Sequence, residues 1–305
     1  MKSIIVKKDN KNDLVSYIYH SFPSLSKSNI YKALRNKDIR INGTKVNKNT
    51  KINEYDKIDI YLNDNILFNL PNNIDIIFED NNILICYKPQ GLLSNSEENL
   101  DNSFIDEPTF SDLVKKYYSE AKICHRLDRN TGGLLIFAKN NLAYKEILKA
   151  FKNSNIKKEY IAYVSNSSFS KNHEILEKYI LKDEKKGFCK IYDYNIKNSQ
   201  KIITEYFVIS KNLLMDYAIL KIIIHTGKTH QIRAQLKNIS HPIIGDSKYG
   251  KNEINKKFKK NKQLLFAYKY CFNFEANSCL SYLNNLNVCL DSKYYSNKLG
   301  SDFYG

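Results

Sequence analysis

The chain has 305 residues, of which 42% are hydrophobic and 12% aromatic, so it contains enough apolar side chains for a large core and a smaller second one. Its apolar runs are shorter than the about 20 residues of a membrane-spanning helix, and its N-terminus lacks the apolar core of a signal peptide, so we expect a cytoplasmic protein without a membrane segment. The net charge of +16 indicates a polyanionic partner, and nucleic acid is the first candidate.

Arginine is used sparingly in this chain. Lysine supplies 43 of the 48 basic residues, so part of the positive charge is a general lysine bias that produces only a solvated surface. Arginine differs from lysine because its planar group donates two parallel hydrogen bonds to one acceptor group. The positions to consider first are therefore Arg35, Arg40, Arg126, Arg129 and Arg233.

The first 62 residues predict a small α/β module. Two helices are indicated by apolar stripes around Ile18 and Leu34, and a hairpin by Asn42-Gly43 after the alternating segment 39–41. Residues 55–62 alternate as a closing strand, and residues 63–73 have the Asn-rich composition of a linker. The module is either an RNA-binding unit, which its basic second helix favours, or an ordinary appendage.

Residues 74–305 predict a second domain of a different kind. We expect strands over residues 74–78, 83–87, 134–138, 159–164, 203–209 and 217–225, and helices over 110–118, 142–151 and 229–237. This irregular order favours an α+β fold with a mixed, largely antiparallel sheet over a repeated βαβ arrangement. The lysine-rich segment 251–262 is expected to be an exposed loop.

The cysteines and histidines indicate neither disulfide bonds nor a metal site. The six cysteines form no C-x-x-C pair, and no histidine lies at zinc-finger spacing from them. His225, His230 and His241 are not spaced as ligands on one helix. We expect reduced, mostly buried thiols, no metal and no cofactor.

A charged cluster over residues 125–133, His-Arg-Leu-Asp-Arg-Asn-Thr-Gly-Gly, precedes a predicted apolar strand. The two glycines permit a tight turn, which would present Asp128 at the strand mouth between Arg126 and Arg129. Two neighbouring cations keep a carboxylate ionised, and such a group can attack a sugar carbon. A structural ion pair is the alternative interpretation.

A second cluster covers residues 225–233, His-Thr-Gly-Lys-Thr-His-Gln-Ile-Arg. It is not a phosphate-binding loop, because Ile222 occupies the place of the first glycine of that motif. Arg233 is expected in the first turns of a helix, where it would form a bidentate pair with a distant carboxylate, and Asp128 is the candidate. In the strand 158–164, Tyr160 offers a ring for stacking on a base or is an ordinary core tyrosine.

Taken together and in this order, these segments resemble the RluA/RluD-type RNA pseudouridine synthases. The resemblance rests on Lys-Pro-Gln-Gly at 88–91, His-Arg-Leu-Asp at 125–128, the strand 158–164, Gly-Lys-Thr-His-Gln-Ile-Arg at 227–233 and the segment 241–250. Residues 1–62 resemble the αL RNA-binding module of longer members. Three positions depart from the family pattern: Gly132 replaces Ser or Thr, Lys228 replaces Arg, and Phe266 replaces His.

The resemblance implies isomerisation of uridine to pseudouridine in structured RNA, ribosomal rather than transfer RNA, by a monomer. It implies that Asp128 is the catalytic aspartate, that Arg126 takes the place of the flipped uridine in the RNA helix, that Tyr160 stacks on the base and that Arg233 pairs with Asp128. The residues expected to contact RNA are Lys27, Lys32, Arg35, Arg40, Arg129 and Lys228. The alternative is a non-catalytic RNA-binding assembly factor with a vestigial pocket.

Overall fold

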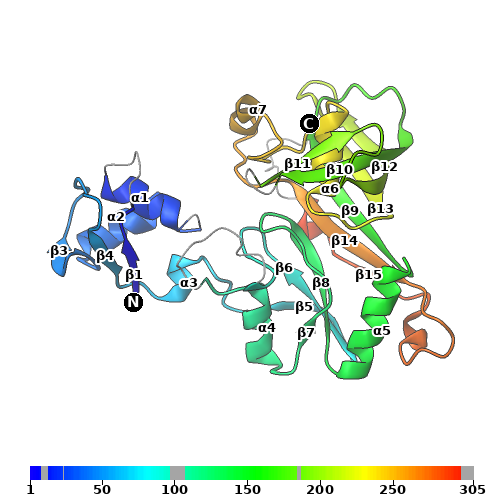
Figure 1. Cartoon of the computed structure of the whole chain (residues 1–305), viewed down its shortest axis with the longest axis horizontal. Coiled ribbons are helices and arrows are strands. Elements are labelled where there is room, and N and C mark those ends of the chain that lie inside the picture. Colours follow the sequence, from blue (N-terminus) through cyan, green and yellow to red (C-terminus); the bar gives the residue numbers. More distant parts are fainter. Residues whose placement is uncertain (8–12, 23, 97–106, 184–186, 297–305) are drawn as a thin grey trace. The chain divides into compact units, whose positions relative to one another are not determined.

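The computed structural model describes residues 1–7, 13–22, 24–96, 107–183 and 187–296, and the chain forms two compact units (Figure 1). The first unit consists of Met1–Ile74 and Leu92–Leu113, and the second of Asp75–Gly91 and Val114–Gly305. Within the described ranges, no helix has both the length and the apolar character needed to cross a membrane.

The first unit contains a four-stranded antiparallel sheet in the order β1-β4-β2-β3. Its elements are β1 (Lys2–Ile5), α1 (Leu14–Ser21), α2 (Lys27–Arg35), β2 (Ile39–Ile41), β3 (Thr44–Val46), β4 (Lys57–Ile60) and α3 (Asp64–Leu67). Asp13 and Ser26 start the two longer helices, because their side chains accept the free N–H groups of the first turns. The two predicted helices and the hairpin are confirmed, whereas β1 was not predicted.

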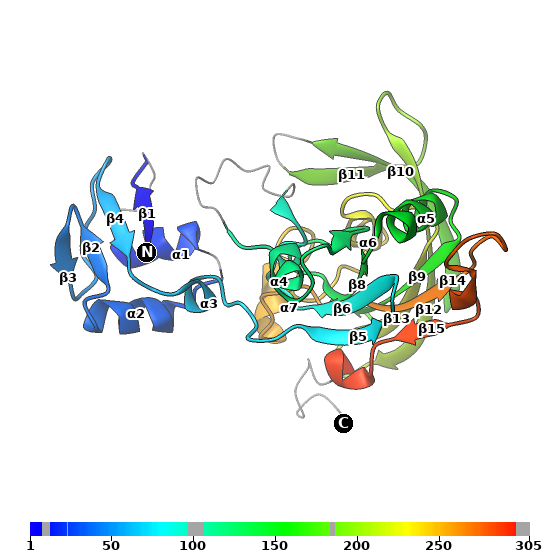
Figure 2. The ribbon, with the colours of Figure 1, turned by 90° about the horizontal axis from the view of Figure 1, so that it is seen from below.

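The second unit is built on an eleven-stranded sheet in the order β11-β10-β12-β13-β9-β14-β8-β6-β5, with β15 on β14 and β7 on β8 (Figures 1 and 2). Its strands are β5 (Asp75–Glu79), β6 (Ile83–Lys88), β7 (Lys122–Ile123), β8 (Gly132–Ala138), β9 (Ile156–Ser165), β10 (His173–Asp183), β11 (Phe188–Tyr192), β12 (Gln200–Asn212), β13 (Tyr217–Ile224), β14 (Leu265–Phe272) and β15 (Asn287–Cys289). Among the described strand pairs, β14–β8 is parallel and the rest are antiparallel. The predicted α+β fold with a mixed, largely antiparallel sheet is confirmed.

Two helices, α5 (Asn141–Lys152) and α6 (Gln231–Asn238), pack on this sheet. The described residues also form α4 (Phe110–Tyr117), which begins in the first unit and ends in the second, and α7 (Asn252–Lys257), with 3-10 turns at Ser281–Leu283 and Ser292–Tyr294. Ala143, Ile147 and Ala150 of α5 belong to a core cluster that also contains Ile85 of β6 and Ile136 of β8. Ala234 of α6 packs in a separate cluster with residues of β10 and β12. The apolar spacing of α5 thus places one face of that helix on the sheet, whereas the first six residues of α6, Gln231 to Leu236, are all buried.

Two segments differ from their predicted form. The linker at residues 63–73 contains α3, and its Leu67 and Phe68 are buried within the first unit. The lysine-rich segment 251–262 contains α7 and is not simply exposed, because Phe258 is 1% exposed. In both segments the buried apolar residues are few and are surrounded by asparagine or lysine, so the composition of the segment did not reveal them.

Candidate active site

A cavity of about 270 Å³ opens between the ends of several strands in the second unit. It brings together five of the residues singled out from the sequence, namely Arg126, Asp128, Tyr160, Lys228 and Arg233. It also has lining residues that the sequence did not single out as site residues, among them Thr131, Lys158 and His230. The volume is slightly below the about 300 to 1,000 Å³ of pockets for drug-sized ligands, which suits one nucleoside better than a duplex.

Asp128 lies on the loop that leads into β8, and this loop is fixed through its backbone. The Thr131 N–H donates to the Asp128 carbonyl at 2.9 Å, which closes a turn. The fully buried Lys88 ammonium donates to the Arg129 carbonyl at 3.0 Å, and the Gln90 amide donates to the Asn130 carbonyl at 3.1 Å. The position of Asp128 is therefore set by groups that do not compete for its carboxylate.

The two glycines after this loop have a different role from the predicted one. They begin β8, and the tight turn lies before them, at residues 128–131. Gly133 has φ +129°, and a Cβ there would lie 2.3 Å from the Ala267 carbonyl oxygen of β14. Glycine is required because the backbones of β8 and β14 approach too closely for any side chain.

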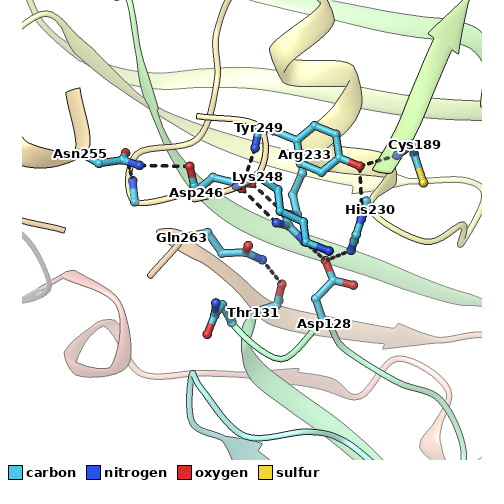
Figure 3. A network of polar contacts seen from close by, with 12 residues as sticks. Asp128, Thr131, Cys189, His230, Arg233, Asp246, Lys248, Tyr249, Asn255 and Gln263 are labelled. Carbon is cyan, nitrogen blue, oxygen red and sulfur yellow. Dashed lines mark hydrogen bonds and ion pairs between the residues drawn. The ribbon is translucent and has the colours of Figure 1, made fainter. Parts of the chain in front are cut away.

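Arg233, the third residue of α6, connects two aspartates (Figure 3). Its Nε and Nη2 donate to Asp246 at 2.7 and 2.9 Å, and its Nη1 donates to Oδ2 of Asp128 at 2.8 Å. The predicted contact with Asp128 is present, but the prediction of a bidentate pair between them is wrong. The bidentate partner is Asp246, which is buried beneath Arg233 and was not recognised as a site residue in the sequence.

The surroundings of Asp128 favour its anionic form. Burial alone would raise the pKa of this carboxyl group, but Arg233 above all, with Arg126 and any positive charge on His230, outweighs burial and leaves the pKa below its ordinary value. The side chain is 25% exposed and faces the cavity. Asp128 is therefore an ionised, oriented carboxylate that a ligand in the cavity can reach.

His230 lies just before α6 with left-handed backbone angles, φ 56° and ψ 15°. Its Nε2 is 3.9 Å from Oδ2 of Asp128, and its Nδ1 is 3.0 Å from the Tyr249 hydroxyl oxygen. That hydroxyl also accepts the backbone N–H of Cys189 in β11 at 2.7 Å. The sequence motif contains His230, but no spacing signal indicated its contacts with Asp128 and Tyr249.

Tyr160 and Lys158 project from the same face of β9 into the cavity. Tyr160 is 6% exposed, and burial together with the nearby Asp128 raises the pKa of its hydroxyl. Burial lowers the pKa of the Lys158 ammonium, which lies over the Phe151 ring at 5.0 Å. The alternation of β9 was visible in the sequence and would have placed Lys158 beside Tyr160.

The other basic residues predicted to contact RNA occupy different surroundings. Arg126 is exposed at the cavity wall, whereas Arg129 does not line the cavity. In the first unit, the guanidinium of Arg40 lies over the Tyr61 ring at 4.7 Å. The remaining three are exposed along α2, and they are Lys27, Lys32 and Arg35.

The motif histidine His125 is structural. The backbone N–H of Ile136 donates to its Nε2 at 3.2 Å, and burial lowers its pKa to about 3, so it is neutral. Among the described residues, no group of three or more His, Cys, Asp or Glu side chains is arranged to hold a metal ion. The chemistry that this site offers is that of one carboxylate held by donors beside an aromatic ring.

Comparisons with known proteins identify the family. The model of the RNA pseudouridylate synthase family matches residues 82–238. An uncharacterised RNA pseudouridine synthase of Mycoplasma capricolum is 33% identical, over 93% of this chain and 95% of the relative. Ribosomal large subunit pseudouridine synthase C of Rickettsia bellii is 29% identical, over 82% of this chain and 87% of the relative.

The fold agrees with this match. The structure of human RNA pseudouridylate synthase domain containing 1 superimposes with a TM-score of 0.58, covering 72% of this chain and 83% of the human chain at 19% identity. The matched range covers just over half of this chain and includes the loop with Asp128 and the helix with Arg233. The chain therefore belongs to the RNA pseudouridylate synthase family and is an RNA pseudouridine synthase.

Proposed function

We propose that this enzyme converts specific uridines of large-subunit ribosomal RNA into pseudouridine, with Asp128 as the catalytic aspartate. The choice of RNA is supported by relatives whose names specify the large ribosomal subunit, such as the Rickettsia bellii protein. The choice of residue rests on one observation: Asp128 is an ionised carboxylate that lines the cavity and is held there by Arg233.

The reaction breaks the bond between C1′ and N1 and makes a bond between C1′ and C5 of the same uracil. Asp128 either attacks C1′, so that the uracil leaves as an anion, or removes the C2′ proton to leave a glycal. The freed uracil rotates in the cavity and its C5 bonds to C1′. On the first route this displaces the Asp128 carboxylate from C1′, and on the second the proton taken by Asp128 returns to C2′. Loss of the C5 proton then restores the conjugated ring. A primary isotope effect with 2′-deuterated uridine would identify the glycal route, and its absence would favour attack at C1′.

The other cavity residues act on the nucleotide around this step. Tyr160 stacks on the extruded base, and Arg126 takes the place that the base leaves in the RNA helix. Arg233 keeps Asp128 ionised and oriented, and Lys228 contacts the RNA backbone. Removing a base from its helix costs a few kcal/mol, which contacts to the phosphates offset.

Residues 1–62 supply part of these contacts as an RNA-binding module, and residues 74–305 form the catalytic domain, which works as a monomer in the cytoplasm. The proposal is supported by Lys27, Lys32 and Arg35, which are exposed on the same short helix, with Arg40 in the following strand. Replacing Lys32 and Arg35 by Gln should reduce the slope of log RNA affinity against log salt concentration by about two, one for each charge removed. Turnover at saturating RNA should be unchanged.

Tritium release tests the catalytic assignment. Large-subunit ribosomal RNA labelled with 5-tritiated uridine should lose tritium with the wild type and not with Asp128→Asn, a near-isosteric variant without the charge. Asp193→Asn, which changes a 78% exposed carboxylate, is the matched control and should release tritium normally. Wild-type release from Asp128→Asn would contradict the assignment.

The same assay tests the substrate. Transfer RNA labelled in the same way should release little tritium compared with the ribosomal RNA. Faster release from transfer RNA would reject the ribosomal assignment and leave the role of Asp128 intact. No release from either RNA with the wild type would instead favour a non-catalytic RNA-binding protein.

A further inference from the structure

The hydrogen bonds around Tyr249 determine where His230 carries its proton (Figure 3). The Tyr249 oxygen accepts the backbone N–H of Cys189 at 2.7 Å, and a backbone N–H can only donate. The hydroxyl therefore has its own hydrogen to give, and Nδ1 of His230 lies 3.0 Å away. The sulfur of Cys189 is a much weaker acceptor than an imidazole nitrogen, and its thiol donates to the Thr229 carbonyl at 3.3 Å. Nδ1 thus accepts, and the proton of a neutral His230 is on Nε2.

The Nε2–H of His230 faces the carboxylate of Asp128. Nε2 is 3.9 Å from Oδ2, the same oxygen that accepts Nη1 of Arg233 at 2.8 Å. Among the described residues, no donor contacts the other oxygen, Oδ1. Nη1 of Arg233 donates to this carboxylate, and Nε2 of His230 lies on the same side but beyond hydrogen-bond distance, so Oδ1 is directed away from both, as Figure 3 shows.

The charges around His230 favour the neutral imidazole. Burial disfavours its protonated form, as do Arg233 on its own helix and Lys248 on the following loop, whereas Asp128 and Asp246 favour it. The balance lowers the pKa of His230 to about 4. The Tyr249 hydroxyl, which approaches from the far side together with Cys189 of β11, acts in the same sense, because its hydrogen occupies the nitrogen that an imidazolium would need as a donor.

The backbone of His230 is consistent with a specific placement of this ring. A non-glycine residue with φ 56° is unusual, and here the side chain gives no hydrogen bond to the start of α6. The ring is instead directed into the cavity with 13% of the side chain exposed. Left-handed backbone at a cavity residue is typical of sites where orientation matters.

We propose that His230 is a positioning residue for Asp128: as a neutral imidazole whose proton Tyr249 directs to Nε2, it acts with Arg233 on Oδ2 and leaves Oδ1 free for the ribose. Its neutrality matters, since a protonated His230 would add a further positive charge to those of Arg233 and Arg126 and make the carboxylate a poorer nucleophile and a weaker base. This inference rests on the proposed catalytic role of Asp128.

Nitrogen-15 NMR of histidine-labelled protein tests the tautomer without reference to activity. The His230 signals are assigned by their loss in His230→Gln, and at pH 7 we expect a neutral ring with the proton on Nε2. Tyr249→Phe, which keeps the ring against Arg233 but removes the hydroxyl, should move the proton partly to Nδ1. A wild-type ring that is protonated on Nδ1, or on both nitrogens, would overturn the inference.

Kinetics test the consequence. His230→Ala should lower kcat about a hundredfold, the loss expected for a misplaced reacting group, with KM for RNA nearly unchanged. His230→Gln, which restores an N–H donor near the position of Nε2, should recover part of kcat. Tyr118→Phe, which removes a hydroxyl on the Lys139 carbonyl away from the cavity, is the matched control for Tyr249→Phe. Normal kcat in His230→Ala alongside an inactive Asp128→Asn would reject the positioning role and leave the proposed function standing.

Discussion

Arg233→Lys separates the two interactions that this arginine makes, because a lysine keeps the charge but not the geometry. Arg233 donates three charge-assisted hydrogen bonds, two to Asp246 and one to Asp128, from nitrogens that point in fixed directions. The ammonium of a lysine is a single point and cannot reach both aspartates in this way. Since Asp246 is fully buried, the ammonium should remain with Asp246, and Asp128 should lose its donor.

The size of the effect follows from the bonds that are lost. A hydrogen bond to a charged group contributes about 1.5–3 kcal/mol, and disruption of a buried ion pair costs about 3–5 kcal/mol. The backbone N–H groups of Lys248 and Tyr249 still donate to Asp246, which limits the loss. We therefore expect about 3 kcal/mol less stability and a Tm lower by roughly 6–12 °C, since about 2–4 °C correspond to each kcal/mol in a domain of this size.

The substitution should also lower activity and shift the pH dependence of kcat/KM. Burial raises the pKa of Asp128, and Arg233 is the main group that lowers it, so without this donor the pKa rises. A carboxylate with a raised pKa is protonated at higher pH, so the acid limb of kcat/KM should shift upward, with about a hundredfold lower kcat from lost orientation.

Thermal unfolding and a pH profile of tritium release measure both effects, and Arg35→Lys on the exposed face of α2 is the control for the change of residue type. Wild-type Tm and kcat in Arg233→Lys would refute the argument from bond geometry. An acid limb that moves to lower pH would refute the assignment of Arg233 as the group that keeps Asp128 ionised.

Two further predictions concern β9. Tyr160→Phe keeps the stacking ring, worth about 1–3 kcal/mol, so if the hydroxyl helps to remove the C5 proton, this variant should accumulate a C5-linked adduct, whereas Tyr160→Ala should bind the base poorly. Equal single-turnover tritium release by Tyr160→Phe and wild type would limit the residue to stacking. Lys158→Met should reduce the slope of log affinity against log salt by about one, as expected when one phosphate contact is lost. Lys157→Met, at an exposed position on the opposite face of the strand, should change it less, and equal slopes for the two variants would remove Lys158 from the RNA contacts.

Segments whose own pattern determines their structure were predictable from the sequence. The hairpin at Asn42-Gly43 and the helix over Asn141–Lys152 follow local signals, a turn dipeptide and an apolar stripe. Strand β10 was missed because Ile175, Leu176, Tyr179 and Ile180 repeat at helical spacing. The segment is a strand because it pairs with β12 along eight positions. This pairing between distant segments cannot be recognised from a local pattern.

The candidate site could also be predicted only in part. Asp128 and Arg233 belong to dense motifs, and the expectation that they meet across 105 positions in the chain came from chemical complementarity. Asp246 was not considered as a partner of Arg233, because nothing in the segment 241–250 itself indicated a role for its carboxylate. This carboxylate, only 13 positions from Arg233 in the chain, is the partner in the bidentate pair.

Two departures from the family pattern explain each other. Gly132 and Phe266 are partners in the parallel pair of β8 and β14, and the Phe266 ring is fully buried against the glycine. A Cβ at Gly132 would lie 3.0 Å from Cδ1 of Phe266 and 3.2 Å from Cγ of Gln90. The larger ring at position 266 thus crowds a side chain at position 132, where the family pattern has a histidine and a hydroxyl residue.

A double-mutant cycle tests this coupling. Gly132→Ser should destabilise the wild type by about 1–3 kcal/mol, the usual cost of overpacking a buried site. Phe266→His should also be destabilising by itself, because it buries a polar ring without a partner and leaves space beside Gly132. In the double variant the serine occupies that space and offers the imidazole a hydrogen-bond partner, so the combined loss should be smaller than the sum by about 0.5 kcal/mol or more. Urea unfolding of the four proteins gives the coupling energy. Additive losses would mean that the two substitutions in this chain arose for separate reasons, and that the contact between Gly132 and Phe266 does not explain why this chain lacks the hydroxyl.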